Sequence, residues 1–353
     1  MTPVAGVVRR HLILTLVVVG LVALPVFATD YFTSFVVTRA LMLGMAAATI
    51  VFLHAYGGMT SLAQYLLFGI AGFMVGNASG QAGSRGLQLG WDPWVAVVFA
   101  LAVCLAVSWV LGALASNSTG IYYLMLTLVY AVIGFSFFGQ VTTFSGFGGI
   151  TGIRPPTLIA DQPFRLYYLA LLLSLATYLG LRALAHTPFG LALQGIRDDH
   201  VRMASLGYNV QLHRTVTFTI AGFIAGCAGV LNVWWNGQID PTSISIGPTL
   251  DLLIIAVIGG ISYLEGAWLG AIVFVAANNY LRSVPLIDQL GITGARFNTV
   301  VGLLLLLIMI LSPEGLAGII DRLRSGGRRV RGIEPHPERV GGGADPPAPG
   351  DGG

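Results

Sequence analysis

The polar side chains that interrupt the apolar segments of this sequence are the first candidates for chemistry. His54, Ser61 and Gln64 stand close together in the chain, around a short apolar stretch that contains glycine. A polar side chain in lipid is costly unless it lines a pathway or bonds to a neighbouring helix. We therefore expect His54, Ser61 and Gln64 to line a pore, with hydrogen bonding between helices as the structural alternative.

Enzymatic chemistry finds little support in the residue types. The sequence has no lysine, so it lacks both a Walker A phosphate loop and a Schiff-base site. No spacing places a Ser or Cys nucleophile beside a base. His186, His200 and His213 lack the short spacing of a metal site, and Cys104 and Cys227 sit in apolar segments as small hydrophobic residues. We expect no catalytic activity, no cofactor and no metal.

The composition predicts which elements must position these residues. Of 353 residues, 55% are hydrophobic and only 9% are charged, and the mean hydropathy is +0.81. Soluble domains carry about 25% charged residues. Apolar runs of about 20 residues are long enough to cross a bilayer. We predict an all-α, polytopic transmembrane helix bundle with about ten spans, near residues 11–28, 36–55, 61–77, 94–115, 120–139, 166–184, 214–235, 250–262, 266–281 and 297–312.

The domain organisation follows from where the apolar segments end. Residues 1–320 are expected to form one transmembrane domain, with residues 186–213 as its most polar internal loop. Residues 321–353 are Arg-rich and then Gly- and Pro-rich, and they have too little apolar content to pack. We expect them to be a disordered tail.

The distribution of arginine predicts the orientation. With ten spans and a cytoplasmic N-terminus, six of the 18 basic residues fall outside: Arg39, Arg85, Arg154, Arg165, Arg282 and Arg296. The other twelve fall inside, as the positive-inside rule expects. Both termini are thus expected in the cytoplasm, and the net charge of +3 reflects topology rather than nucleic-acid binding.

The polar loop at residues 186–213 has the pattern of short amphipathic helices. Pro188 and Gly190 mark its start, and apolar residues such as Leu193 and Ile196 recur at helical spacing. Asp198 and the residue after it suit a helix cap, and Gly207 suits a helix end with positive φ. The alternative is a solvated connector between spans.

Glycines at helical spacing predict close helix packing. Gly222, Gly226 and Gly229 follow an i, i+4, i+7 pattern, and Gly259 and Gly260 lie in a later Gly-rich region. Small side chains let membrane helices approach closely. Ordinary packing within the chain explains this stripe as well as a special contact does, and both place the helix in the interior.

The polar loop resembles the cytoplasmic coupling loop of LivM-type branched-chain amino acid permeases, members of the binding-protein-dependent transport inner membrane component family of ABC importers. The loop departs from the family at Leu191, where the family has Arg, and at Gly195. The resemblance suggests a coupling set that includes Asp198 beside the shared residues Gly190, Ala192, Leu193, Ile196, Arg197, Ala204, Leu206 and Gly207.

Other segments resemble the same family in the same order. They are Gly-Met-Thr-Ser-Leu-Ala at residues 58–63, Gly-Ile-Thr-Gly-Ile at 149–153, Ile-Gly-Gly-Ile at 258–261 and Ser-Pro-Glu-Gly-Leu-Ala-Gly at 312–318. Together these segments span about residues 35–320. The resemblance implies a fold similar to the vitamin B12-type importer permeases.

The resemblance also implies a function and partners. The expected function is translocation of branched-chain or related amino acids across a bacterial inner membrane, with membrane lipid around the subunit. The implied partners are cytoplasmic ABC ATPase subunits, a second LivH-like permease and an extracytoplasmic substrate-binding protein. Alternatives are a related permease for urea, amides or a sugar, an ion-driven secondary transporter, and a membrane-embedded enzyme.

Overall fold

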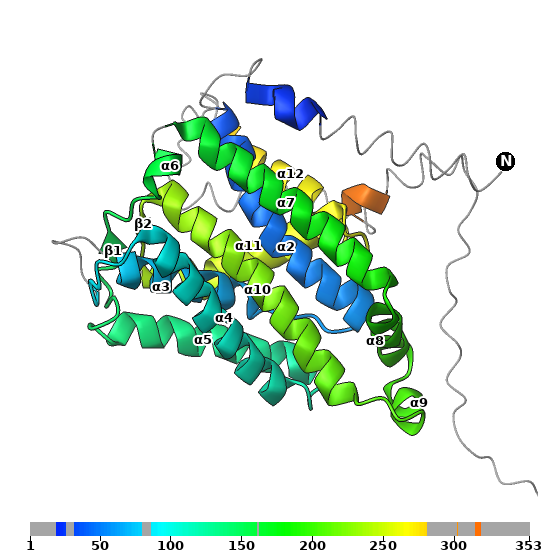
Figure 1. Ribbon diagram of the computed structural model, residues 1–353. Coiled ribbons are helices and arrows are strands. Elements are labelled where there is room, and N and C mark those ends of the chain that lie inside the picture. Colours follow the sequence, from blue (N-terminus) through cyan, green and yellow to red (C-terminus); the bar gives the residue numbers. More distant parts are fainter. Residues whose placement is uncertain are drawn as a thin grey trace, which may run out of the picture.

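The computed structural model describes residues 19–25, 32–79, 86–160, 162–280, 302 and 315–318. Its elements, which Figure 1 labels where there is room, are mostly helices. In chain order they are η1 (Phe32–Val37), α2 (Thr38–Gly57), α3 (Gln64–Ser79), α4 (Pro93–Ala115), α5 (Gly120–Gln140), β1 (Ile150–Thr151), α6 (Thr157–Ala160), α7 (Pro163–His186), α8 (Pro188–Asp198), α9 (His200–Ser205), α10 (Val210–Asn236), β2 (Gln238–Ile239), η2 (Pro241–Ile244), α11 (Ile246–Gly259) and α12 (Gly266–Tyr280).

Among the described residues, five helices are long and apolar enough to cross a membrane. They are Phe35–Gly57, Pro93–Ala115, Gly120–Gln140, Phe164–His186 and Val210–Asn236, and each coincides with a predicted span. The all-α membrane bundle is therefore confirmed. Two further predicted spans correspond to the shorter apolar helices α11 and α12. Most of the predicted spans 11–28 and 297–312, and all of the tail, lie outside the described residues, so the count of ten stays a prediction.

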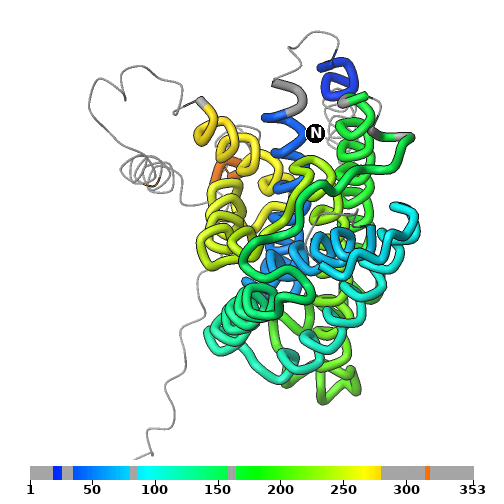
Figure 2. The backbone as a smooth tube through the Cα atoms, turned by 90° about the vertical axis from the view of Figure 1, so that its left-hand side faces the viewer, coloured from blue at the N-terminus to red at the C-terminus, as the bar shows by residue number. Residues whose placement is uncertain are grey.

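Helix α2 is the centre of the bundle. Its membrane-length window is 94% buried, and α7, α10, α11 and α12 all pack against it. Figure 2 shows α12 in yellow on one side of the blue α2 and the cyan α4 on the other. The run Ala46, Ala47 and Ala48 is fully buried, and such small side chains let neighbouring helices come close to the α2 backbone.

The glycine stripe of α10 faces α3 and α4. A Cβ atom added at Gly229 would lie 1.9 Å from the carbonyl oxygen of Phe68 on α3. At Gly222 it would lie 2.3 Å from the Ser108 hydroxyl on α4, and at Gly226 it would lie 2.8 Å from the Cys104 sulfur. These separations leave no room for a methyl group, so the stripe is an interface within the chain.

The second pair of glycines lies where the chain turns from α11 to α12. A Cβ atom at Gly259 would lie 1.9 Å from the carbonyl oxygen of Gly266, at the start of α12. Gly260 has a φ of 109° and follows the last residue of α11. The turn therefore brings the two backbones together.

Two short strands, β1 and β2, lie at the end of the bundle opposite to α8 and α9 (Figure 1). β1 pairs with β2 in antiparallel register, with Ile150 opposite Ile239. Beside them, burial raises the pKa of Asp240, but hydrogen bonds from Ser243 and Thr242 outweigh burial and hold that pKa below its usual value. The pairing of β1 with β2 therefore joins the loop after α5 to the end of α10.

The glycine stripe generates a first prediction. Gly229→Ala should lower the melting temperature of the purified protein, because the methyl group forces α10 away from the α3 backbone, at a cost of about 1–3 kcal/mol. Gly180→Ala is the matched control, because Gly180 of α7 is exposed and has no atom within 4 Å of the added methyl group. Equal melting temperatures for Gly229→Ala and the wild type would contradict the packing described above.

Candidate helix break and coupling site

The chain leaves helical geometry between α2 and α3. Helix α2 ends at Gly57, and Gly58 has a left-handed φ of 64°, which favours glycine. Its N–H donates to the carbonyl oxygen of His54 at 3.1 Å, and the N–H of Met59 donates to that of Leu53 at 3.0 Å. Residues 58–63 then form an irregular segment, called the break below, before α3 begins at Gln64.

Hydrogen bonds to side chains satisfy further backbone groups of the break. The N–H of Leu62 donates to the hydroxyl of Thr127 on α5 at 3.1 Å. The N–H of Ala63 donates to the hydroxyl of Ser61 at 3.2 Å. Irregular backbone at membrane depth is tolerated where protein surrounds it, and α5 supplies part of that surrounding.

The three candidate pore-lining residues lie together at this break. The Nδ1 atom of His54 is 2.9 Å from the hydroxyl of Thr60, while Ser61 is fully buried beside the backbone that it caps. Gln64 is also fully buried, and neither its Oε1 nor its Nε2 has a hydrogen-bond partner. Gln64 is therefore a buried amide without a hydrogen-bond partner among the described residues.

The predicted coupling loop consists of two capped helices. Thr187 caps α8 by accepting a hydrogen bond from the N–H of Gly190, and Pro188 is the first residue of α8. A Cβ atom at Gly190 would lie 2.1 Å from the carbonyl oxygen of Leu184, so α8 folds tightly against the end of α7. The buried face of α8 is Gly190, Ala192, Leu193 and Ile196.

Helix α8 attaches to the last turn of α2 and to the break. Leu193 is fully buried, and its side chain lies 3.8 Å from the position of a Cβ at Gly57. The stem of Arg197 lies over Gly58, and its guanidinium donates to the carbonyl oxygen of Ala55. Asp198 forms an ion pair with Arg197 at 2.8 Å, which holds the guanidinium in place. Sequence reasoning missed this attachment, because no local pattern indicates it.

Helix α9 differs from the amphipathic pattern that the sequence suggested. Asp199 caps it by accepting a hydrogen bond from the N–H of Arg202, but α9 has no buried residue. Ala204 is exposed, and so is Leu206 just after the helix, at 65%. Gly207 has a φ of 88° and open space around it, as its position at a helix end predicts. Met203 packs against Gly195 of α8, but the other apolar side chains at α9, such as Val201 and Leu206, are exposed.

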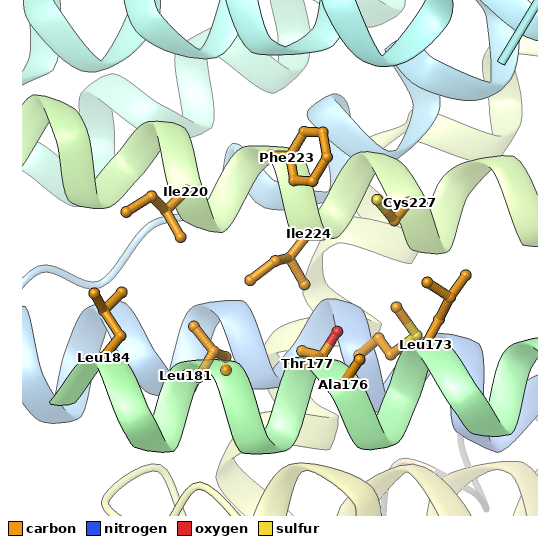
Figure 3. A pocket seen from close by; sticks show the side chains of 11 residues that line it. Leu173, Ala176, Thr177, Leu181, Leu184, Ile220, Phe223, Ile224 and Cys227 are labelled. Atoms are coloured by element: carbon orange, nitrogen blue, oxygen red, sulfur yellow. The ribbon is translucent and has the colours of Figure 1, made fainter. Parts of the chain in front are cut away.

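An apolar groove of about 440 Å³ opens between α7 and α10 (Figure 3). Its lining includes Leu173, Leu181, Ile220 and Phe223, and Thr177 carries its only hydroxyl group. A groove without charged groups suits an acyl chain rather than the charged ends of an amino acid. Among the described residues, no group of three or more His, Cys, Asp or Glu side chains could hold a metal.

The attachment of α8 generates a second prediction. Leu193→Ala should increase amide hydrogen exchange in residues 188–198, because a buried leucine contributes about 2–5 kcal/mol to packing. Leu191→Ala is the matched control on the same helix, because Leu191 is 59% exposed. If both variants exchange like the wild type, α8 is not held to α2 by its buried face.

Known proteins with similar sequences indicate the family of this chain. The model of the family described as the branched-chain amino acid transport system / permease component matches residues 32–312. The high-affinity branched-chain amino acid transport system permease protein LivM of Escherichia coli is 30% identical over 178 residues, which are 50% of this chain and 39% of that protein. The chain therefore matches less than half of the length of this relative.

Two further relatives match over shorter segments. The autoinducer 2 import system permease protein LsrC of Klebsiella pneumoniae is 30% identical over 128 residues, 35% of this chain and 36% of that protein. The probable branched-chain amino acid transport permease protein LivH of Methanocaldococcus jannaschii is 23% identical over 158 residues, 43% of this chain and 47% of that protein. No solved structure matches significantly. Because the family model matches most of its length, the chain belongs to the branched-chain amino acid transport permease family.

Proposed function

We propose that this chain is the membrane-spanning permease subunit of an ABC importer that moves branched-chain or related amino acids across a bacterial inner membrane. Family membership supports a permease, and the LivM relative supports the substrate class. The observation that carries the mechanism is the attachment of α8 to the break through Leu193 and Arg197. A polar loop that only connected two spans would not need that contact.

The proposed partners follow from exposed surfaces and from the family. Cytoplasmic ATPase subunits would hydrolyse the ATP and dock on α8 and α9, because Leu191, Val201 and Leu206 are 59%, 64% and 65% exposed. A short helix with exposed apolar side chains suits a groove on another protein. A second, LivH-like permease and an extracytoplasmic substrate-binding protein complete the proposed importer.

Membrane lipid and the second permease are proposed to cover the exposed helices. The membrane-length segments of α4 and α5 are each only 28% buried. Of the five spans, α4 is the most apolar, and α5 is as apolar as α2. We further propose about ten spans in an arrangement like that of the vitamin B12-type importer permeases. Both termini would then be cytoplasmic, with residues 1–320 as the permease domain and residues 321–353 as its tail.

In the proposed mechanism, a movement of α8 and α9 is passed on to the membrane-spanning helices. When the ATPase subunits close on ATP, they move α8 and α9. Because Arg197 binds the carbonyl oxygen of Ala55 and covers Gly58, the displacement reaches the end of α2 and the break. The hydrogen bond from Leu62 to Thr127 then passes it to α5. The bundle would thereby alternate between outward- and inward-facing states.

The alternative within transport is a permease for another small polar molecule, such as urea, an amide or a sugar. One relative is named as a permease of an autoinducer 2 import system, so members of related sequence carry other cargo. Leucine uptake by the reconstituted importer separates the two proposals.

The third prediction tests the docking of the ATPase. Gly207→Val places a β-branched residue at positive φ, and Ala204→Glu adds bulk and charge to an exposed contact surface. Neither residue lies in a span, so both variants should reach the membrane at normal levels. Both should lose co-purification of the ATPase subunits and lose leucine uptake.

Gly152→Val is the matched control for backbone strain. Gly152 has a φ of 77° and open space around it, but it lies next to β1 at the opposite end of the bundle. This control should keep the ATPase subunits bound. If Gly207→Val and Ala204→Glu both retain wild-type uptake and ATPase association, the loop is only a connector, and the ATPase docks elsewhere on the chain.

A further inference from the structure

Four buried polar side chains beside the break lack hydrogen-bond partners for at least one polar atom. They are Gln64 of α3, Tyr123 and Tyr130 of α5, and Arg214 of α10, and we call them the donor cluster. Their exposed fractions are 0%, 2%, 8% and 9%. Buried polar atoms are usually hydrogen-bonded, so four such residues in one region of the bundle need an explanation.

The members of the donor cluster come from three helices, and Tyr130 and Arg214 both interact with Tyr123. Tyr123 interacts electrostatically with Arg214 and Tyr130, and its hydroxyl lies beside Ser61 without reaching hydrogen-bond geometry. Ser61 binds the N–H of Ala63, the residue before Gln64. Tyr123 and Tyr130 also share the face of α5 that carries Thr127, which holds the break. The cluster thus lies along α5 and reaches the break through Ser61, three residues before Gln64.

The charge of the cluster is uncompensated in the part of the chain that the structure describes. Arg214 forms no ion pair there, its Nε has no partner, and one Nη donates to the carbonyl oxygen of Ser116 at 3.3 Å. The tyrosine hydroxyls and the N–H groups of the Gln64 amide can donate as well, while the unpaired Oε1 of Gln64 can only accept. The first turn of α3, a helix of 16 residues, contributes partial positive charge at the same place.

This excess of donors indicates the chemistry of a ligand. A carboxylate carries a negative charge and accepts about four hydrogen bonds, and it forms strong paired bonds with a guanidinium. A ligand cation would be repelled by Arg214, and an uncharged apolar group would leave the donors unsatisfied. Every member of the transported class that we propose is an amino acid, and each therefore carries a carboxylate.

We propose that the donor cluster binds the carboxylate of the amino acid at the inner end of its pathway. This proposal rests on the proposed function, because it assumes that an amino acid passes through the bundle. Ser116 and Arg214 stand at the end of α4 and the start of α10, at the same end as α8 and α9. The break joins the cluster to Arg197 of α8, so movement of α8 changes the site and releases the amino acid.

The experiment measures ligand binding to the two permeases with their ATPase subunits in lipid nanodiscs, without the substrate-binding protein, because that protein would bind leucine itself. The probes are leucine, 4-methylpentanoate, which lacks the amino group, and 3-methylbutylamine, which lacks the carboxylate. Leucine and 4-methylpentanoate should bind, and 3-methylbutylamine should not. Arg214→Gln and Tyr123→Phe should each weaken leucine binding by about tenfold or more, because each removes a bond to a charged group.

Tyr122→Phe is the matched control. Tyr122 neighbours Tyr123 in the sequence but is 74% exposed, so loss of its hydroxyl should leave leucine affinity unchanged. If Arg214→Gln misfolds, Tyr123→Phe decides, because it removes one hydroxyl and keeps the ring packed.

Three results would overturn the carboxylate site. They are a wild-type importer that binds no leucine, 3-methylbutylamine bound as tightly as leucine, and wild-type affinity in the folded Tyr123→Phe variant. In each of these cases, leucine uptake by the wild-type importer still tests the proposed function separately. Such uptake without a carboxylate site would mean that the donor cluster has only a structural role.

Discussion

Irregular backbone inside a membrane must find its hydrogen-bond partners within the protein, because lipid offers none. Residues 58–63 are an irregular segment between two apolar helices, and neighbouring elements supply hydrogen-bond partners for its backbone groups. Thr127 of α5 accepts a bond from Leu62, and Arg197 of α8 donates to Ala55 in the last turn of α2. The break is therefore the point at which α2, α3, α5 and α8 are joined, and a force on one of them reaches the others.

Local patterns predicted much of this fold. Runs of apolar residues alone predicted five of the spans, because the thickness of a bilayer sets how long such a run must be to cross it. The loop at residues 186–213 was expected to hold short helices, and Pro188, Asp199 and Gly207 act there through their own backbone preferences. Each of these features depends on residues within one or two turns of each other.

The contacts between distant parts of the chain could not be predicted in the same way. Arg197 and Ala55 are 142 residues apart, and no periodicity relates them. The same holds for the pairing of Ile150 with Ile239, and for the meeting of Tyr123 with Arg214. Sequence reasoning selected Gln64 as a polar residue in an apolar region, but its lack of a partner appears only in the packed bundle. Periodicity shows which face of a helix is apolar, but it does not show which other helix or strand packs against that face.

A disulfide between α8 and the break tests most directly whether they move together. Cysteines at Gly58 and Arg197, with Cys104 and Cys227 replaced by alanine, would have Cβ atoms about 3.4 Å apart, close to the separation that a disulfide needs. Leucine uptake by the reconstituted double variant would be compared after reduction and after oxidation. If α8 and the break move as one body, the oxidised variant takes up leucine at least as fast as the reduced variant, in which the contact of Arg197 with Ala55 is missing. If uptake occurs after reduction and is lost after oxidation, α8 moves relative to the break, and the account of transmitted displacement is wrong.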